Sequence, residues 1–320
     1  MAQEPRTLME AVRYFSDPDV ALQHMVDLRW GGTATCPTCG RADVRFISTR
    51  RLWECKAKHS RKQFSAKVGT IFEDSAIPLD KWFVAIWSIA NCKNGISSYE
   101  LGRSIGVTQK SAWHMLHRIR LAMKTGSFEK MTGETETDET FIGGLAKNMH
   151  QHKRERVITG RGGIGGGKTA VMGILERSRD KRLSRVRATV IQNATSATLH
   201  GHIHDTVQRG ATVYTDSYSS YYGLTGFRHS MIDHSVEYVN GRVHTNGIEN
   251  FWSLLKRGLR GTYISVEPFH LGRYIDEQVF RFNERDGGDG DRFRTALRGI
   301  IGKKLTYKEL TTNGALASAA

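Results

Sequence analysis

The sequence contains few cysteines, few prolines and no long apolar run. With only 4 cysteines in 320 residues, it cannot be a disulfide scaffold. The best apolar stretch, Trp82–Ala90, is about half of the roughly 18 to 20 residues that a membrane helix needs. The first residues lack a secretory signal pattern. At 39% hydrophobic content a core is nevertheless possible, so we predict a globular cytoplasmic protein of one to three domains with no membrane association.

Negative charge is also scarce relative to positive charge. Lysine and arginine number 47 against 32 acidic residues, which gives a net charge of +15 and a pI near 9.8. Such an excess favours a polyanionic partner, and nucleic acid is the most common one. The charge therefore predicts a polyanionic partner, and a merely basic protein without such a partner is the alternative interpretation.

Changes in composition divide the chain into segments. The predicted organisation is a helical segment over 1–28, a small strand-rich domain over 29–67, helices over 78–125, alternating strands and helices over 134–302, and a partly disordered tail over 303–320. Within the fourth segment we predict strands at Thr135–Ile142, Thr169–Arg177, Ser184–Ile191 and Thr212–Thr215, helices at Thr195–Gln208, Ile248–Leu259 and Leu271–Asn283, and a loop at Asp286–Asp291. This predicts a multidomain α+β protein.

Three of the cysteines are clustered with a histidine. Cys36 and Cys39 form a C-x2-C knuckle, and Cys55 and His59 follow as C-x3-H. Thiolates and an imidazole at this spacing are typical of a closed tetrahedral zinc site. Because all four positions would be filled by protein, we predict a structural Zn²⁺ ion in a zinc ribbon and no catalysis there.

Residues 97–116 have the pattern of a helix-turn-helix motif. Apolar residues recur at helical spacing on both sides of Gly106, and Thr108 is placed to cap the second helix. This arrangement would direct Gln109, Lys110 and His114 toward DNA. An ordinary helical hairpin is the alternative interpretation.

A glycine-rich run matches a nucleotide-binding pattern by its letters alone. Gly162–Thr169 fits G-x4-G-K-T, but a true phosphate-binding loop follows a buried strand and opens a helix. Here the preceding residues are basic and the following ones, through Ile174, resemble a strand. We therefore predict no nucleotide binding and a hairpin whose Arg161 and Lys168 contact DNA phosphates.

Three carboxylates lie at the ends of predicted elements. Asp138 and Asp216 end strands, and Glu249 begins a helix. Two aspartates on neighbouring strands and a glutamate on a helix can share two divalent ions that promote phosphoryl transfer. Oxygen ligands of this kind suit Mg²⁺ or Mn²⁺. Carboxylates are common without such a role, so spacing alone leaves both readings open.

Several motifs together resemble one family. The sequence resembles bacterial insertion-sequence transposases with an N-terminal zinc ribbon and an integrase-like DDE catalytic domain, over nearly its whole length. The residues that carry this resemblance are Cys36–Cys39, Gln63–Ser65 with Gly69–Phe72, Asp138–Gly144, Gly160–Gly162 with Gly167–Thr169, Asp216, and His244–Arg257.

The resemblance implies a ribonuclease-H-like catalytic fold and catalytic Mg²⁺ or Mn²⁺. It also implies double-stranded DNA as the partner and a nucleoid-associated location. It implies an enzyme that binds the terminal repeats of an insertion sequence, cleaves them and joins the freed 3′-OH ends to target DNA, as a homodimer or higher oligomer. Asp138, Asp216 and Glu249 match the three acids, with Asn246 as the alternative third ligand. Lys256, followed by Arg257, matches the basic residue that contacts the DNA end. Trp252 could stack on a base or pack. A non-catalytic DNA-binding regulator and a structure-specific nuclease are the alternative functions.

Overall fold

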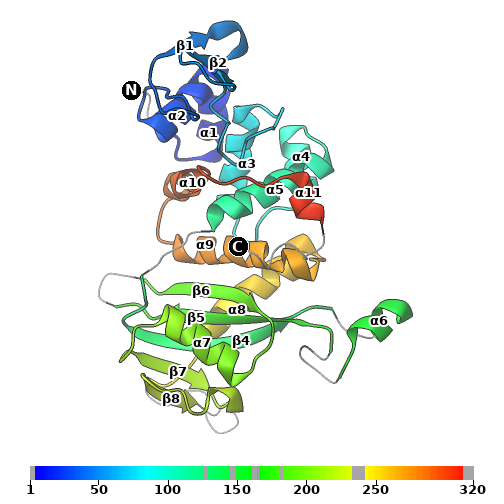
Figure 1. Cartoon of the computed structure of the whole chain (residues 1–320). Coiled ribbons are helices and arrows are strands. Elements are labelled where there is room, and N and C mark those ends of the chain that lie inside the picture. Colours follow the sequence, from blue (N-terminus) through cyan, green and yellow to red (C-terminus); the bar gives the residue numbers. More distant parts are fainter. Residues whose placement is uncertain are drawn as a thin grey trace. The chain divides into compact units, whose positions relative to one another are not determined.

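The computed structural model describes residues 4–124, 129–144, 149–160, 164, 166–179, 183–232 and 242–312. The chain forms two compact units: one contains residues 1–125 and 287–320, and the other contains residues 126–286 (Figure 1). None of the helices in the described ranges has the length and apolar character needed to cross a membrane.

The first unit combines a small sheet with helices. Its elements are α1 (Leu8–Phe15), α2 (Pro18–Trp30), β1 (Val44–Ile47), a 3-10 turn (Ser48–Arg50), β2 (Leu52–Cys55), β3 (Gln63–Phe64), α3 (Leu79–Asn91), α4 (Ser98–Ile105), α5 (Gln109–Met123), α10 (Asp289–Arg298) and α11 (Tyr307–Thr311). The three strands are antiparallel in the order β1-β2-β3.

Local capping explains where the helices of this unit begin. Asp17 accepts a hydrogen bond from the N–H of Asp19 at the start of α2, where Pro18 occupies the first helical position. Ser97 and Glu100 form a capping box at the start of α4. These caps fix the predicted helix pair near the N-terminus and the first helix of the predicted helix-turn-helix.

The end of the chain completes the core of the first unit. Phe293 on α10 is buried, with its ring centroid 5.7 Å from that of Phe15 and 5.1 Å from that of Trp87. Leu305 and Leu310 are also buried. The second unit therefore ends at residue 286. The sequence analysis predicted a loop there, but it placed the end of this segment at residue 302. Residues 313–320 of the expected tail lie outside the described part.

A five-stranded mixed sheet forms the centre of the second unit. Its strands are β4 (Glu134–Ile142), β5 (Thr169–Glu176), β6 (Arg185–Ile191), β7 (Thr212–Asp216) and β8 (Arg228–Ile232), in the order β6-β5-β4-β7-β8. The β4, β5 and β6 strands pair antiparallel, whereas β4, β7 and β8 run parallel. This confirms the predicted α+β class, with a zinc ribbon and a ribonuclease-H-like sheet domain.

Helices α7 (Ser196–Thr206), α8 (Asn246–Gly258) and α9 (Leu271–Asn283) pack against the strands of this sheet. The second unit also contains α6 (Gln151–Val157), which projects away from the sheet (Figure 1), a 3-10 turn (Ser219–Tyr221), a π-helical turn (Leu259–Tyr263) and a 3-10 turn (Pro268–His270). Side chains of β5 alternate between two buried clusters. Met172 packs in the cluster that includes Leu199 of α7, and Val171 packs in the cluster that includes Phe251 of α8.

Candidate active site and zinc site

Three cysteines and one histidine converge in the ribbon. Gly40, with φ of 73°, closes the knuckle by donating its N–H to the carbonyl of Cys36 at 2.8 Å. The ligand atoms of Cys36, Cys39, Cys55 and His59 all lie within 4.8 Å of one another. The Cys36 Sγ is 3.5 Å from the His59 Nε2, and the Sγ atoms of Cys39 and Cys55 are 3.6 Å apart. The predicted set is brought together.

The spacing of these atoms suits zinc. Tetrahedral Zn²⁺, with Zn–S near 2.3 Å and Zn–N near 2.0 Å, separates its ligand atoms by roughly 3.5 to 3.8 Å. Burial acts to raise the pKa of the Cys36 thiol, but the backbone N–H groups of Cys39 and Thr38 bring it down to about 6. The thiolate that a metal needs is therefore favoured. Four protein ligands leave no open position for chemistry, so this is a structural site.

Asp138 and Asp216 lie on adjacent strands of the second unit. Asp216 ends β7 as predicted, whereas Asp138 lies in the middle of β4 and not at its end. The parallel strands β4 and β7 pair Glu134 with Thr212 and Glu136 with Tyr214. The same register, continued by two residues, brings Asp138 level with Asp216 at the end of β7. Burial, then the charges of Glu139 and Asp216, raise the pKa of Asp138 to about 7. The two aspartates are therefore close enough to repel each other.

Glu139 belongs to the same acidic group, although sequence reasoning left it out. Strand alternation indicated that it faces away from Asp138, and its Oε2 indeed accepts a hydrogen bond from the buried Tyr221 hydroxyl at 2.7 Å. Burial and the charge of Asp216 raise the pKa of Glu139. Asp216 thus interacts with acids on both faces of β4. The adjacency of Glu139 to Asp138 was the available sequence signal.

Helix α8 carries the remaining predicted acid. Asn246 is its first residue and Glu249 lies one turn later, and both are exposed. The Glu249 Oε1 accepts a hydrogen bond from the Thr245 hydroxyl at 2.8 Å. Trp252, a further turn along, is buried, and its indole Nε1 donates to the Asp138 Oδ2 at 2.9 Å. Of the two roles open to Trp252, packing against the sheet is observed, and it joins the strand of Asp138 to the helix of Glu249.

A glycine makes room for this tryptophan. Gly173 on β5 pairs with Asp138 on β4. A Cβ atom at Gly173 would lie 2.6 Å from Cζ2 and 2.7 Å from Cη2 of Trp252, and 2.8 Å from Cδ1 of Ile248. Contacts this short do not occur between real side chains, so the close approach of α8 to the sheet requires glycine at this position.

Glu136 holds the start of α8, and the sequence analysis missed it. The residue is only 1% exposed. Its Oε2 accepts the backbone N–H of Ile248 at 2.9 Å, in the first turn of α8, and a Cβ atom at Gly247 would lie 2.8 Å from that oxygen. A carboxylate in this place also complements the helix dipole. Its position two residues before Asp138, on the same strand face, was the signal available.

Arg177 compensates the buried charge of Glu136. Its Nε donates to the Glu136 Oε1 at 2.8 Å, and its two terminal nitrogens donate to the backbone carbonyls of His244 and Arg242. Its guanidinium also lies over the ring of Tyr214, 4.3 Å from the centroid. The segment before α8 is therefore tied to β4 and β7, the two strands that carry Asp138 and Asp216.

Two of the three predicted acids interact with each other, and the third is bonded to another residue. Asp138 and Asp216 interact, whereas Glu249 is bonded to Thr245 on the helix. Within the described ranges, the zinc tetrad is the one group of three or more His, Cys, Asp or Glu ligand atoms that all lie within 4.8 Å of one another. Mutual repulsion of carboxylates in low dielectric opposes a tighter cluster until a cation offsets it.

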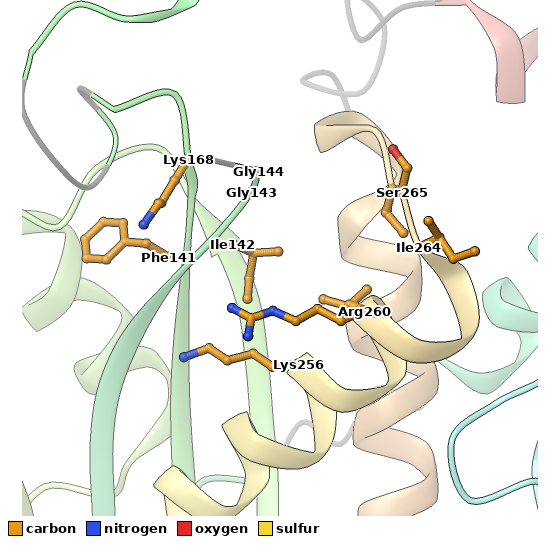
Figure 2. Close-up of a pocket in the computed structure, with 11 residues that line it drawn as sticks. Phe141, Ile142, Gly143, Gly144, Lys168, Lys256, Arg260, Ile264 and Ser265 are labelled. Atoms are coloured by element: carbon orange, nitrogen blue, oxygen red, sulfur yellow. The ribbon is translucent and has the colours of Figure 1, made fainter. Parts of the chain in front are cut away.

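A basic pocket lies near the C-terminal end of β4. It has a volume of about 480 Å³, and Lys168, Lys256 and Arg260 line it together with Gly143 and Gly144 (Figure 2). Two of the predicted DNA-binding residues, Lys168 and Lys256, are thus brought to one place. Arg257 is exposed and does not line the pocket, and Arg161 lies outside the described residues.

Comparison with known proteins decides the family. Residues 130–283 match the ISXO2-like transposase domain, and residues 16–60 match the transposase zinc-ribbon domain. An uncharacterized transposase-like protein of Haemophilus influenzae is 34% identical over 104 residues, which cover 32% of this chain and 84% of that protein. The chain belongs to the ISXO2-like transposases.

A second relative aligns with most of the transposase's length. An uncharacterized protein in the transposable element ISH50 of Halobacterium salinarum is 28% identical over 287 residues, which cover 85% of this chain and 95% of that protein. The similarity therefore extends over most of the transposase and nearly all of this relative.

The two helices and the turn predicted over residues 97–116 are present in the transposase. Gly106, with φ of 63°, ends α4, and the Thr108 hydroxyl accepts the N–H of Ser111 to cap α5. Gln109 and Lys110 are exposed, with the Lys110 ammonium 4.8 Å from the centroid of the Tyr307 ring.

His114 differs from its predicted orientation. It is half-buried, with its ring centroid 5.7 Å from that of Tyr307 and its Nε2 3.4 Å from the carbonyl oxygen of Leu305. The residues near the end of the chain therefore cover this part of α5, and His114 is turned toward them.

The glycine-rich run of the transposase leads into a strand. Thr169 begins β5, whereas a phosphate-binding loop opens a helix. A Cβ atom at Gly143 would lie 3.2 Å from the Cα of Lys168, so the glycine at the end of β4 allows the backbone of Lys168 to approach. This contact places Lys168 at the basic pocket.

Proposed function

We propose that this transposase cleaves the ends of an insertion sequence and joins their 3′-OH groups to target DNA in the cytoplasm. The observation that carries the proposal is the pair Asp138 and Asp216 on adjacent parallel strands, where burial and then the charges of Glu139 and Asp216 raise the pKa of Asp138 to about 7. Membership of the transposase family and the +15 charge support a DNA substrate.

The acids of the sheet unit are the proposed holders of two divalent cations. Asp138, Asp216 and Glu249 offer the hard oxygen ligands that Mg²⁺ or Mn²⁺ prefers, and Asn246 is an alternative third ligand on the same helix. When bound, such ions activate an attacking oxygen and stabilise the leaving one. The repulsion between Asp138 and Asp216 is relieved by a cation, which is the physical basis for the fit.

The surrounding side chains have supporting roles in this proposal. Both oxygens of Asp138 are held in place, because the indole N–H of Trp252 donates to Oδ2 and the backbone N–H of Glu139 donates to Oδ1. Glu136 and Arg177 hold the start of α8, and with it Asn246 and Glu249, against the sheet. Positional accuracy of this kind is a large part of phosphoryl-transfer catalysis.

DNA contacts are proposed for both units. Lys168, Lys256, Arg257 and Arg161 of the second unit would bind phosphates at the cleaved end, and Gln109 and Lys110 of α5 would contact the terminal repeat. Holding two ends together requires at least two chains, so we propose a homodimer or higher oligomer on DNA.

The test uses labelled DNA duplexes that carry the flanking ends of the transposase's own gene. The protein is incubated with them and Mg²⁺, beside Asp138→Ala, Asp216→Ala and the matched control Asp205→Ala, which removes an exposed acid of α7. Joined products are expected with the wild type and the control and are expected to vanish in the other two variants.

The alternative functions give different products. Binding without cleavage, equal in all four proteins, would indicate the non-catalytic regulator. Cleavage without joining, abolished in Asp138→Ala and Asp216→Ala, would indicate the structure-specific nuclease. Joining that survives in either of these variants would contradict the proposed catalytic residues.

A further inference from the structure

The basic pocket concentrates positive charge without matching acids. Lys168 comes from the start of β5, Lys256 from α8, and Arg260 from the π-helical turn, and their side chains extend toward the same space (Figure 2). No acidic residue is among the described residues that line it. Three cations held close together repel one another, so this arrangement favours an anionic group in the pocket.

The wall of the pocket also has apolar residues. Ile142, Leu259 and Val266 belong to this apolar part of the lining, as does Phe141, and Figure 2 shows Ile142 and Phe141 among the cationic side chains. A volume of about 480 Å³ is within the range of pockets that enclose a whole small ligand, which is more than a lone phosphate needs. Cationic and apolar residues in one pocket complement a nucleotide, whose phosphate is anionic and whose base has flat apolar faces.

The backbone beside the pocket is unusual. Leu259–Tyr263 forms a π-helical turn directly after α8, and Ile264 follows with φ of 62° and ψ of −56°. π-helical turns are rare and occur often at functional sites. A β-branched residue at positive φ is strained, and such strain is kept where a particular side-chain position is needed. The Ile264 side chain is 82% exposed at the pocket rim.

We propose that one nucleotide at the DNA end leaves the base stack and enters this pocket. Its phosphate binds Lys168, Lys256 and Arg260, its base lies against the apolar part of the lining, and Ile264 inserts into the stack at the vacated position. Apolar side chains that wedge into base steps act in this way in other DNA-binding proteins. The inference rests on the proposed function, because it takes the DNA end as the substrate.

The experiment places 2-aminopurine, which brightens when it is unstacked, at successive adenine positions near the end of the same duplexes. The full-length wild type with Mg²⁺ is expected to brighten one position several-fold. Arg260→Gln is expected to lose most of that signal and to bind the duplex roughly tenfold more weakly, as the loss of a charged phosphate contact implies. Arg209→Gln, which removes an exposed arginine elsewhere in the second unit, is the control and should behave as wild type.

Ile264→Gly tests the insertion of Ile264 into the base stack separately from folding. Glycine accepts the positive φ at this position, so the variant keeps its fold, which circular dichroism verifies. It is expected to lose the brightening while retaining duplex binding. Joining by the wild type with no bright position, or brightening retained in both pocket variants, would overturn the inference and leave the proposed function intact. A wild type that does not bind the duplex would overturn both.

Discussion

Replacing Gly173 with alanine should destabilise the second unit through one identified contact. The added Cβ would meet the outer ring of Trp252 at 2.6 to 2.7 Å and the end of Ile248 at 2.8 Å, and both side chains are buried. Overpacking of this kind costs about 1 to 3 kcal/mol. Displacement of the indole also breaks its hydrogen bond to Asp138, which adds about 1.5 to 3 kcal/mol because the acceptor is charged. At a pH above 7, where Asp138 is charged, we expect Gly173→Ala to lower the free energy of unfolding by about 2.5 to 6 kcal/mol.

A second substitution isolates the contact. Trp252→Phe removes the outer ring atoms that the new Cβ would strike, so alanine at position 173 should cost less in that background. We expect the double variant to be more stable than the sum of the single effects by at least about 1 kcal/mol. The control is Gly201→Ala in α7, where a Cβ meets nothing within 4 Å and alanine should stabilise the helix by about 0.5 to 1 kcal/mol.

Urea unfolding followed by circular dichroism measures these effects. The data are fitted with one transition for each compact unit, because each unit can unfold by itself. The reasoning is refuted if Gly173→Ala unfolds at the wild-type urea concentration, or if the effects at positions 173 and 252 are simply additive. Joining of DNA should fall in Gly173→Ala in parallel, since Asp138 loses its positioning partner.

Three further predictions concern protonation, zinc and the core of the first unit. Asp138 has a pKa of about 7 in the folded protein and near 3.8 when unfolded, so folding takes up a proton at a pH between these two values. Without divalent cations, the free energy of unfolding of the second unit should therefore decrease as the pH rises from about 4 to 7 and then level off. Asp138→Asn should flatten this dependence in thermal unfolding, and equal slopes would contradict the assignment. Zinc chelation should unfold residues 30–67 and leave the second unit folded, as followed by hydrogen exchange; unchanged exchange in that segment would disprove the zinc site. Phe293→Ala should destabilise the first unit by about 3 to 5 kcal/mol in urea unfolding, because it empties a buried aromatic site; a loss below about 1 kcal/mol would show that α10 is not part of its core.

Local patterns in the sequence were sufficient to predict most elements. Alternation predicts β4 to within one residue, and capping residues such as Ser97 and Thr108 predict where helices begin. The zinc tetrad was predictable because its spacing is itself the geometric requirement. These features depend on residues that are near one another in the chain.

Long-range features were not predictable in the same way. The loop predicted at Asp286–Asp291 is present only as far as Gly288, because α10 begins at Asp289, where Asp291 accepts the N–H of Gly288. The packing of Phe293 against Phe15 joins distant segments, which no local period reveals. Glu136 was missed for a similar reason, since its partner is a backbone N–H that carries no sequence signal.

The return of α10 and α11 to the first unit has a consequence for synthesis on the ribosome. The core that supports the zinc ribbon and the helix-turn-helix lacks Phe293 until all of residues 126–286 have emerged. At typical translation speeds this delay is on the order of ten seconds. A chain that ends early would therefore have an incomplete first unit, the one for which we propose contacts to the terminal repeat. Truncated products would then be poor competitors for the DNA sites that full-length chains must occupy.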